Sequence, residues 1–240
     1  MDLGISGRVA LVTAASKGLG RASAVALARE GANVVICARG ADALAAAAAE
    51  AGADAEVLAI PADVTDPAVP AQLVAAAVER FGRLDIVVAN AGGPPAARSL
   101  EVDDDQLEAA LNANLLTSVR LVREALPHLR AGGWGRICCI TSSSIKQPIP
   151  SLALSNTART ALWAWAKTAA ADLFADGITL NLICPGSHAT DRMKAISVPT
   201  GPMGDPDDFG RTVAFLCSEP AKFISGSTLV IDGARSVGLV

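Results

Sequence analysis

The stretch from Val9 to Gly20 constrains the fold of this chain more than any other. Its first part, Val9–Val12, is a short apolar run typical of a buried parallel strand. A turn containing glycine follows, and the alanine-rich segment Arg21–Arg29 has the composition of a helix. The free N–H groups and positive dipole at the start of a helix attract anions. Because glycine lets a pyrophosphate approach the backbone, the stretch predicts a nucleotide site. An ordinary strand-to-helix turn is the alternative.

Predicted strands and helices alternate along the whole chain. The predicted strands cover Val9–Val12, Asn33–Ala38, Glu56–Ile60, Leu84–Ala89, Arg136–Thr141, Ile178–Cys184 and Ser227–Ile231. The predicted helices cover Arg21–Arg29, Ala41–Ala51, Asp66–Phe81 with Pro67 in its first turn, Val102–Leu129 with an interruption near Pro127, Leu152–Ala175 and Pro206–Ser218. This alternation predicts an α/β fold, a three-layer doubly wound parallel sheet (Rossmann fold) of about seven strands. We expect residues 1–240 to form one domain with its ligand site at the carboxyl ends of the strands.

Composition and charge exclude several classes of protein. The net charge is −4 and the sequence has no basic run, so we expect no nucleic-acid partner. It has no run of about 18 uncharged apolar residues, which predicts no membrane span. The first residues lack the features of a signal peptide, so we expect a cytoplasmic protein. Five cysteines without a Cys-x-x-Cys pair predict neither disulfides nor a metal site.

The motif Thr13-Ala-Ala-Ser-Lys-Gly18-Leu-Gly20 resembles the Thr-Gly-x-x-x-Gly-x-Gly turn of short-chain dehydrogenases/reductases. Ala14 replaces the first glycine, which predicts a less tight turn. Later turns repeat the resemblance in family order: Asp63-Val64, Asn90-Ala91-Gly92, Asn114, the segment Asn181 to Pro185-Gly186 and Thr190, and Gly226 with Asp232-Gly233. Within the family, the chain resembles 3-oxoacyl carrier-protein reductases. The resemblance implies a dinucleotide site formed by Thr13, Ser16, Lys17, Gly18, Leu19, Gly20, Arg39, Asp63, Val64, Asn90, Ala91, Gly92, Arg159, Pro185, Gly186, His188 and Thr190.

The end of the second predicted strand indicates which nicotinamide cofactor binds. An acidic residue there hydrogen-bonds a free ribose 2′-hydroxyl and repels a 2′-phosphate. Here the strand ends at Ala38 and Arg39 follows, while Lys17 stands in the phosphate turn. Arginine offers a fork of donors to a phosphate and lysine adds a point charge. The two cations could instead be ordinary surface residues, but the missing acid favours NADP(H).

The predicted catalytic residues are Asn114, Ser142, Ser155 and Arg159. Family members carry serine, then tyrosine thirteen residues later, then lysine four beyond that. In that register this chain has Ser142, Ser155 and Arg159, and it contains no tyrosine. The resemblance also places Asn114 at the asparagine that holds a proton-relay water.

The substitutions change which proton chemistry is available. A serine hydroxyl is far less acidic than a phenol, and arginine stays protonated, so neither relays a proton near neutral pH. The three side chains can still polarise a carbonyl as hydrogen-bond donors. His188 could supply the proton, or its ring could face solvent while only its backbone serves the site. We expect a short substrate lid around residues 191–204.

The resulting hypothesis is an NADP(H)-dependent oxidoreductase that reduces a small-molecule carbonyl substrate at an atypical site. The alternatives are a non-redox lyase, isomerase or cyclase on the same scaffold, and a catalytically silent dinucleotide-binding protein. The resemblance further implies a homodimer or homotetramer, formed through Val102–Leu126 and Leu152–Ala175. Trp163 and Trp165 lie on the second of these helices.

Overall fold

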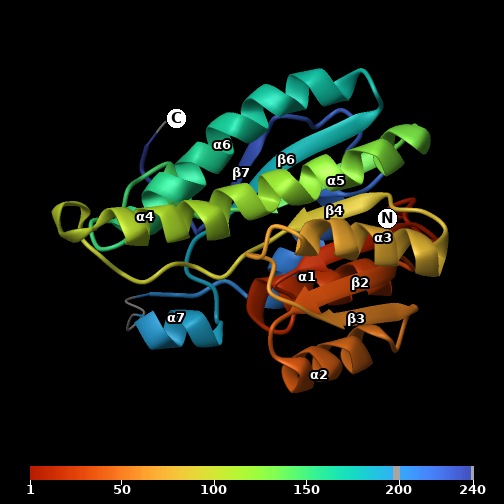
Figure 1. The fold of residues 1–240 in the computed structure, drawn as a ribbon, viewed down its shortest axis with the longest axis horizontal. Coiled ribbons are helices and arrows are strands. Elements are labelled where there is room, and N and C mark those ends of the chain that lie inside the picture. Colours follow the sequence, from red (N-terminus) through yellow and green to blue (C-terminus); the bar gives the residue numbers. More distant parts are fainter. Residues whose placement is uncertain (197–200, 239–240) are drawn as a thin grey trace.

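The computed structural model describes residues 1–196 and 201–238. Seven parallel strands form one sheet in the order β3-β2-β1-β4-β5-β6-β7, which confirms the predicted doubly wound α/β fold (Figure 1). The strands are β1 (Val9–Thr13), β2 (Asn33–Ala38), β3 (Val57–Pro61), β4 (Ile86–Ala89), β5 (Gly135–Ile140), β6 (Ile178–Pro185) and β7 (Thr228–Ile231). The strand order reverses between β1 and β4, and a sheet of this kind binds ligands beyond the carboxyl ends at that point.

Helices cover both faces of the sheet (Figure 1). They are α1 (Gly18–Arg29), α2 (Ala41–Ala51), α3 (Val69–Phe81), α4 (Asp104–Leu111), α5 (Thr117–Ala131), α6 (Ala153–Phe174), α7 (Asp191–Ile196) and α8 (Pro206–Leu216). Alternate residues of each strand face opposite layers. Ala10 and Val12 of β1 pack with α1, α2 and α8, whereas Val9 and Leu11 pack with α3, α5 and α6. None of the described helices has the length and apolar character needed to cross a membrane.

The predicted position of the interruption in the helix Val102–Leu129 is wrong. Pro127 lies inside α5, which continues to Ala131, and the irregular segment is instead the π-helical turn Asn112–Leu116. Proline removes one backbone donor and crowds the carbonyl four residues earlier, but α5 continues past Pro127 to its end. Asn112 fixes the turn, because its Nδ2 donates to the Thr65 carbonyl at 3.0 Å and its carbonyl accepts from Thr117 Oγ1 at 2.8 Å.

The predicted start of the third helix at Asp66 is also wrong. The Asp66 carboxylate accepts the N–H of Ala68 at 2.9 Å, forming a local turn before α3 begins at Val69. Pro70 rather than Pro67 therefore occupies the first turn of the helix.

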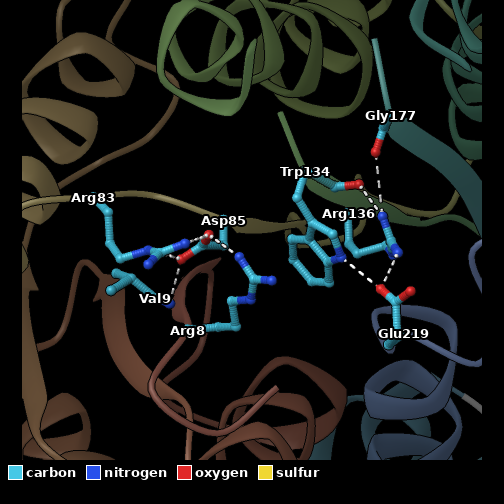
Figure 2. Close-up of polar contacts among 9 residues, drawn as sticks. Arg8, Val9, Arg83, Asp85, Trp134, Arg136, Gly177 and Glu219 are labelled. Atoms are coloured by element: carbon cyan, nitrogen blue, oxygen red, sulfur yellow. Dashed lines mark hydrogen bonds and ion pairs between the residues drawn. The ribbon is translucent and has the colours of Figure 1, made fainter. Parts of the chain in front are cut away.

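At the amino end of the central strands, Asp85 is a buried carboxylate that accepts several hydrogen bonds (Figure 2). The Asp85 side chain is 2% exposed and accepts from Arg8 Nη1 at 3.0 Å and from Arg83 Nε at 2.7 Å. It also accepts the backbone N–H of Val9 at 2.9 Å. These bonds satisfy a buried charge that would otherwise oppose folding.

A second buried charge lies beside it (Figure 2). Arg136 is 2% exposed and donates to the carbonyl of Ser218 at 3.0 Å and to the Glu219 carboxylate at 3.3 Å. The Trp134 ring lies 4.0 Å from the Arg8 guanidinium and 4.1 Å from that of Arg136. The cluster therefore joins the N-terminal strand, the β5 region and the segment after α8 at the end of the sheet opposite the site.

Candidate active site

The turn between β1 and α1 is tied to the end of β4. Thr13 Oγ1 donates to the Asn90 carbonyl at 2.7 Å and accepts the Asn90 N–H at 2.9 Å. Asn90 Nδ2 donates to the Ala14 carbonyl at 3.2 Å. A Cβ added to Gly20 would lie 2.4 Å from that carbonyl oxygen and 2.6 Å from Asn90 Nδ2, so only glycine fits there. Ala14 takes a φ of +49°, and the turn therefore keeps the left-handed conformation that the family's glycine would adopt easily.

One side of this turn opens on a cavity of about 690 Å³ bounded by the ends of β2 and β3. Its lining includes the predicted cofactor residues Ser16, Lys17, Arg39, Asp63, Val64, Ala91 and Gly92, and also Asn114. The Arg39 side chain is 81% exposed, and its Nη1 lies 3.9 Å from the Asp63 carboxylate. The Thr65 N–H, which donates to that carboxylate at 3.0 Å, is the main cause that lowers the pKa of Asp63. Arg39 is therefore available to a ligand phosphate at the rim.

The other side of the turn opens on a second cavity of about 520 Å³. The two cavities share Ala14, Lys17 and residues 91–93. The second is lined by the predicted residues Lys17, Gly18, Leu19, Asn90, Ala91, Gly92, Ser142, Ser155, Arg159, Pro185, Gly186, His188 and Thr190. Of the predicted site residues, Thr13 and Gly20 line neither cavity. They lie behind the turn, where Thr13 bonds Asn90 and Gly20 lies against the Ala14 carbonyl.

Arg159 is held by the backbone at the carboxyl ends of two strands. Its Nη1 donates to the carbonyls of Ile140 at 2.9 Å and Thr141 at 3.2 Å, and its Nη2 donates to the Ala91 carbonyl at 3.4 Å. The residue is 7% exposed, and burial, with a smaller contribution from the Arg192 charge, lowers its pKa to about 10. Arg159 therefore stays protonated at neutral pH and keeps unused N–H groups beside the cavity.

Two serines lie beside this guanidinium in the cavity lining. Ser142 Oγ accepts the N–H of Ser144 at 3.1 Å, which opens a 3₁₀ turn over Ser143–Ile145. Ser155 lies in the first turn of α6 and is 6% exposed. Its hydroxyl has no hydrogen bond within the described part of the chain. Both hydroxyls can therefore donate to an oxygen in the cavity.

Asn114 lies in the π-helical turn and is 1% exposed. Its Nδ2 donates to the Ala110 carbonyl at 3.4 Å, whereas its buried Oδ1 has no partner among the described residues. A buried amide oxygen without a protein partner is a place for an ordered water. π-Helical turns inside helices are frequent at functional sites.

One of the two alternatives stated for His188, a ring that faces solvent, is wrong. The residue is 4% exposed and belongs to the cavity lining, and its ring packs edge-on against Phe209 of α8 at 5.2 Å. Its Nδ1 lies 3.2 Å from the Gly186 carbonyl. Gly204 lies close to the same ring, since a Cβ on Gly204 would lie 2.7 Å from its Nε2.

Residue Arg192 was not predicted from the sequence and also lines this cavity. It belongs to α7, a short helix inside the predicted lid 191–204, of which residues 197–200 lie outside the described structure. Its Nη2 donates to the Pro94 carbonyl at 3.1 Å. Arg192 follows the predicted cofactor residue Thr190 by two positions, and this closeness in the sequence could have identified it as a residue of the cavity.

Comparison with known proteins identifies the family. The family model described as Enoyl-(Acyl carrier protein) reductase matches residues 13–234. The chain belongs to the short-chain dehydrogenase/reductase family of oxidoreductases. It is 32% identical to versicolorin reductase stcU of Emericella nidulans, over 95% of this chain and 96% of that protein. It is 31% identical to the Escherichia coli 3-oxoacyl-[acyl-carrier-protein] reductase FabG, over 96% and 98%.

Solved structures agree with this family membership. L-sorbose reductase from Gluconobacter frateurii, complexed with NADPH and L-sorbose, superposes with a TM-score of 0.94 at 31% identity, covering 100% of both chains. A putative short-chain alcohol dehydrogenase from Sinorhizobium meliloti superposes with a TM-score of 0.90 at 30% identity, covering 97% of this chain and 98% of the other. This short-chain dehydrogenase/reductase thus combines the family fold with a serine and an arginine at Ser155 and Arg159.

Proposed function

We propose that this protein is an NADP(H)-dependent reductase of a ketone, of 3-oxoacyl or similar type, whose serine and arginine act where the family uses tyrosine and lysine. One observation carries the proposal. The cavity of about 520 Å³ is lined both by the Lys17–Leu19 turn and by the cluster Ser142, Ser155 and Arg159. A dinucleotide held at the turn and a carbonyl held at the cluster therefore meet in one space.

The residues of the first cavity fit an NADP(H) molecule. A Cβ at Gly20 would collide with the Ala14 carbonyl behind the turn, so glycine there lets α1 begin close against the turn whose Ala14 and Lys17 line both cavities. Arg39 at the rim and Lys17 in the turn would bind the phosphates, and Thr190 packs beside Gly18 across the cleft. NADPH is present in the sorbose reductase complex. When bound, it supplies a hydride to the carbonyl carbon of the substrate.

Arg159 and the two serines would polarise the substrate carbonyl. The three backbone acceptors fix the Arg159 guanidinium, so its remaining donors face the cavity without reorganising. Ser142 and Ser155 present hydroxyls to the same space. Negative charge that grows on the carbonyl oxygen is thereby stabilised by donors already in place.

A water ordered by Asn114 would deliver the proton. The unpartnered Oδ1 of Asn114 supports a bound water there. Asn114 lines the cavity of about 690 Å³, which adjoins the cavity that the serines line. His188 would serve through its backbone, because its ring packs against Phe209 and its Nδ1 lies 3.2 Å from the Gly186 carbonyl.

The test is to follow NADPH oxidation by the purified protein with a panel of ketones. The proposal predicts substrate-dependent oxidation and a hydroxyl product with at least one of them. NADPH binding without oxidation of any ketone would contradict it.

A non-redox reaction is the second candidate, and the replacement of tyrosine by Ser155 favours it. A donor cluster without a side-chain acid can stabilise an enolate without transferring a hydride. Conversion of a substrate with no change in NADPH would support this candidate, and cofactor binding with no conversion would support a silent dinucleotide-binding protein.

Three further proposals concern architecture. We propose that residues 1–240 act as one NADP(H)-binding domain, and that the segment 191–204 with α7 acts as the substrate lid. We also propose a homodimer or homotetramer formed through α4–α5 and α6. Leu116, in the π-helical turn between α4 and α5, is 40% exposed, and Phe174 at the end of α6 is 41% exposed.

A further inference from the structure

Two guanidinium groups are anchored on one short loop. The loop after β4 presents the Ala91 carbonyl to Arg159 Nη2 at 3.4 Å and the Pro94 carbonyl to Arg192 Nη2 at 3.1 Å. Arg159 comes from α6 and Arg192 from α7, so two separate elements converge here. Their charges are close enough that Arg192 contributes to lowering the pKa of Arg159.

Gly93, between these two carbonyls, leaves the space in which the Arg192 guanidinium lies. A Cβ added to Gly93 would lie 2.2 Å from Arg192 Nη2 and 2.5 Å from its Cζ. The Arg192 guanidinium therefore lies against the loop backbone, and this exposed side chain keeps further N–H donors for a ligand in the cavity that it lines.

Among the described residues, the cavity lining has fewer carboxylates than cations. These residues include Lys17, Arg159, Arg192 and Arg235 against the single acid Asp191, although the chain as a whole has a net charge of −4. Neither Arg159 nor Arg192 forms an ion pair with any residue in the described ranges 1–196 and 201–238. Like charges held together without a counterion cost free energy unless a ligand supplies the anion.

We propose that the substrate is an oxo acid with a free carboxylate, which Arg192 binds while Arg159 and the serines hold the carbonyl. The inference rests on the proposed function and narrows its substrate class. A planar guanidinium matches a carboxylate with two parallel hydrogen bonds. An ester or thioester of the same acid lacks that charge and binds more weakly.

The rest of the lining fits the hydrocarbon part of such a molecule. Ile140, Ile149, Leu152 and Met193 line the same cavity, and Ile149 is 40% exposed there. An apolar group placed on these side chains would leave the carboxylate to Arg192.

The test compares binding of matched acids and esters by titration calorimetry. The probes are 2-oxo-4-phenylbutanoate with its ethyl ester, and acetoacetate with ethyl acetoacetate, each titrated into the protein with and without saturating NADP⁺. We expect at least one acid to bind about tenfold more tightly than its ester. Arg192→Gln should abolish that preference, and Arg192→Lys should retain part of it. The matched control is Lys194→Gln, which removes the same charge from α7 at an exposed residue outside both cavity linings and should leave the preference unchanged.

The outcomes separate this inference from the proposed function. If NADP⁺ binds but each acid and its ester bind equally, the inference is overturned and the reductase proposal stands. If Arg192→Gln weakens NADP⁺ binding as much as acid binding, Arg192 serves the cofactor and the inference is again overturned. If NADP⁺ does not bind at all, the proposed function fails, and the titrations without cofactor still decide whether Arg192 selects a carboxylate.

Discussion

Nη1 of Arg159 donates to the carbonyl oxygen of Ile140 at 2.9 Å, so a cation from α6 is fixed at the carboxyl end of β5. This contact explains how the protein keeps a positive charge at the position where the family has lysine. A lysine has three donors on one nitrogen and could not hold the carbonyls of Ile140 and Ala91 with a planar fork. Arg159 is therefore both a positioned donor and a link between two strands.

Restoring the family pair should increase reductase activity. In Ser155→Tyr with Arg159→Lys, a phenol beside an ammonium group regains a proton donor, and general acid catalysis contributes about 10²–10⁴-fold. We expect kcat for ketone reduction to rise toward that range. Steady-state kinetics measure it, with Arg159→Lys alone as the control. A folded double variant that binds NADPH but reduces no faster would show that the site is built for other chemistry.

Arg39 should determine the choice of cofactor. A charge-assisted contact with the 2′-phosphate stabilises binding by about 1.5–3 kcal/mol. Arg39→Ala should therefore weaken NADPH binding by about tenfold or more and leave NADH binding nearly unchanged. Titration calorimetry with both cofactors measures this, and NADH serves as the internal control. Equal losses for the two cofactors would place Arg39 away from the phosphate.

The imidazole of His188 should not supply the catalytic proton. Its ring packs against Phe209, so His188→Phe keeps an aromatic ring in that place but removes the titratable group and the Nδ1 contact with the Gly186 carbonyl. We expect kcat to change by less than about threefold, against the 10²–10⁴-fold loss of a general acid. Initial rates across the titration range of histidine provide the check. A large loss together with the disappearance of an inflection in the pH profile would make the imidazole the donor.

Gly20→Ala should damage the phosphate turn. The new Cβ would meet backbone and Asn90 atoms at 2.4–2.6 Å, and forced overpacking costs about 1–3 kcal/mol. Thermal unfolding and NADPH titration should show a lower midpoint and weaker binding. Gly132→Ala is the matched control, because its nearest neighbours would lie 3.6 Å away and its φ is −77°. Equal effects of the two substitutions would mean that the close approach at Gly20 is not what the turn depends on.

Glu219 should make stability depend on acid pH. Trp134 Nε1 donates to its carboxylate at 2.8 Å and is the main cause that holds the pKa of Glu219 below its ordinary 4.5. A carboxyl whose pKa is lower in the folded chain stabilises the fold above its unfolded pKa and loses this contribution as pH falls through the folded pKa. The free energy of unfolding should thus fall below about pH 4.5, more steeply than in Glu219→Gln. Urea unfolding measures the difference, and Glu79→Gln, at an exposed site on α3, is the control. Parallel pH curves for the wild type and Glu219→Gln would contradict the assignment.

The sequence predicted most of the fold because each strand of this sheet is a local signal. Runs such as Val9–Val12 are apolar on both faces, and turns such as Gly18-Leu19-Gly20 follow them directly. The π-helical turn at Asn112 was missed because its cause is a contact with the Thr65 carbonyl, 47 residues away. The low helix propensity of proline predicted an interruption near Pro127, which is the wrong position for the same reason: tertiary contacts decide where this helix is irregular.

The sequence predicted several residues of the candidate cavity, but not Arg192 and not the contacts between them. The register Ser142, Ser155 and Arg159 can be counted along the chain, and the three line one cavity. The backbone carbonyls that hold Arg159, and the convergence of Arg192 on the same loop, depend on how α6 and α7 meet the sheet. These contacts join residues that are far apart in the sequence, so no local sequence pattern predicts them.

The most direct test of the central claim follows NADPH absorbance while the purified protein is mixed with a ketone panel that includes the two oxo acids. The account predicts NADPH oxidation that depends on the ketone, yields the corresponding alcohol and falls at least about 10²-fold in Arg159→Met, because the positioned donor is lost. Full NADPH binding without any oxidation, or oxidation that Arg159→Met leaves unchanged, would contradict it.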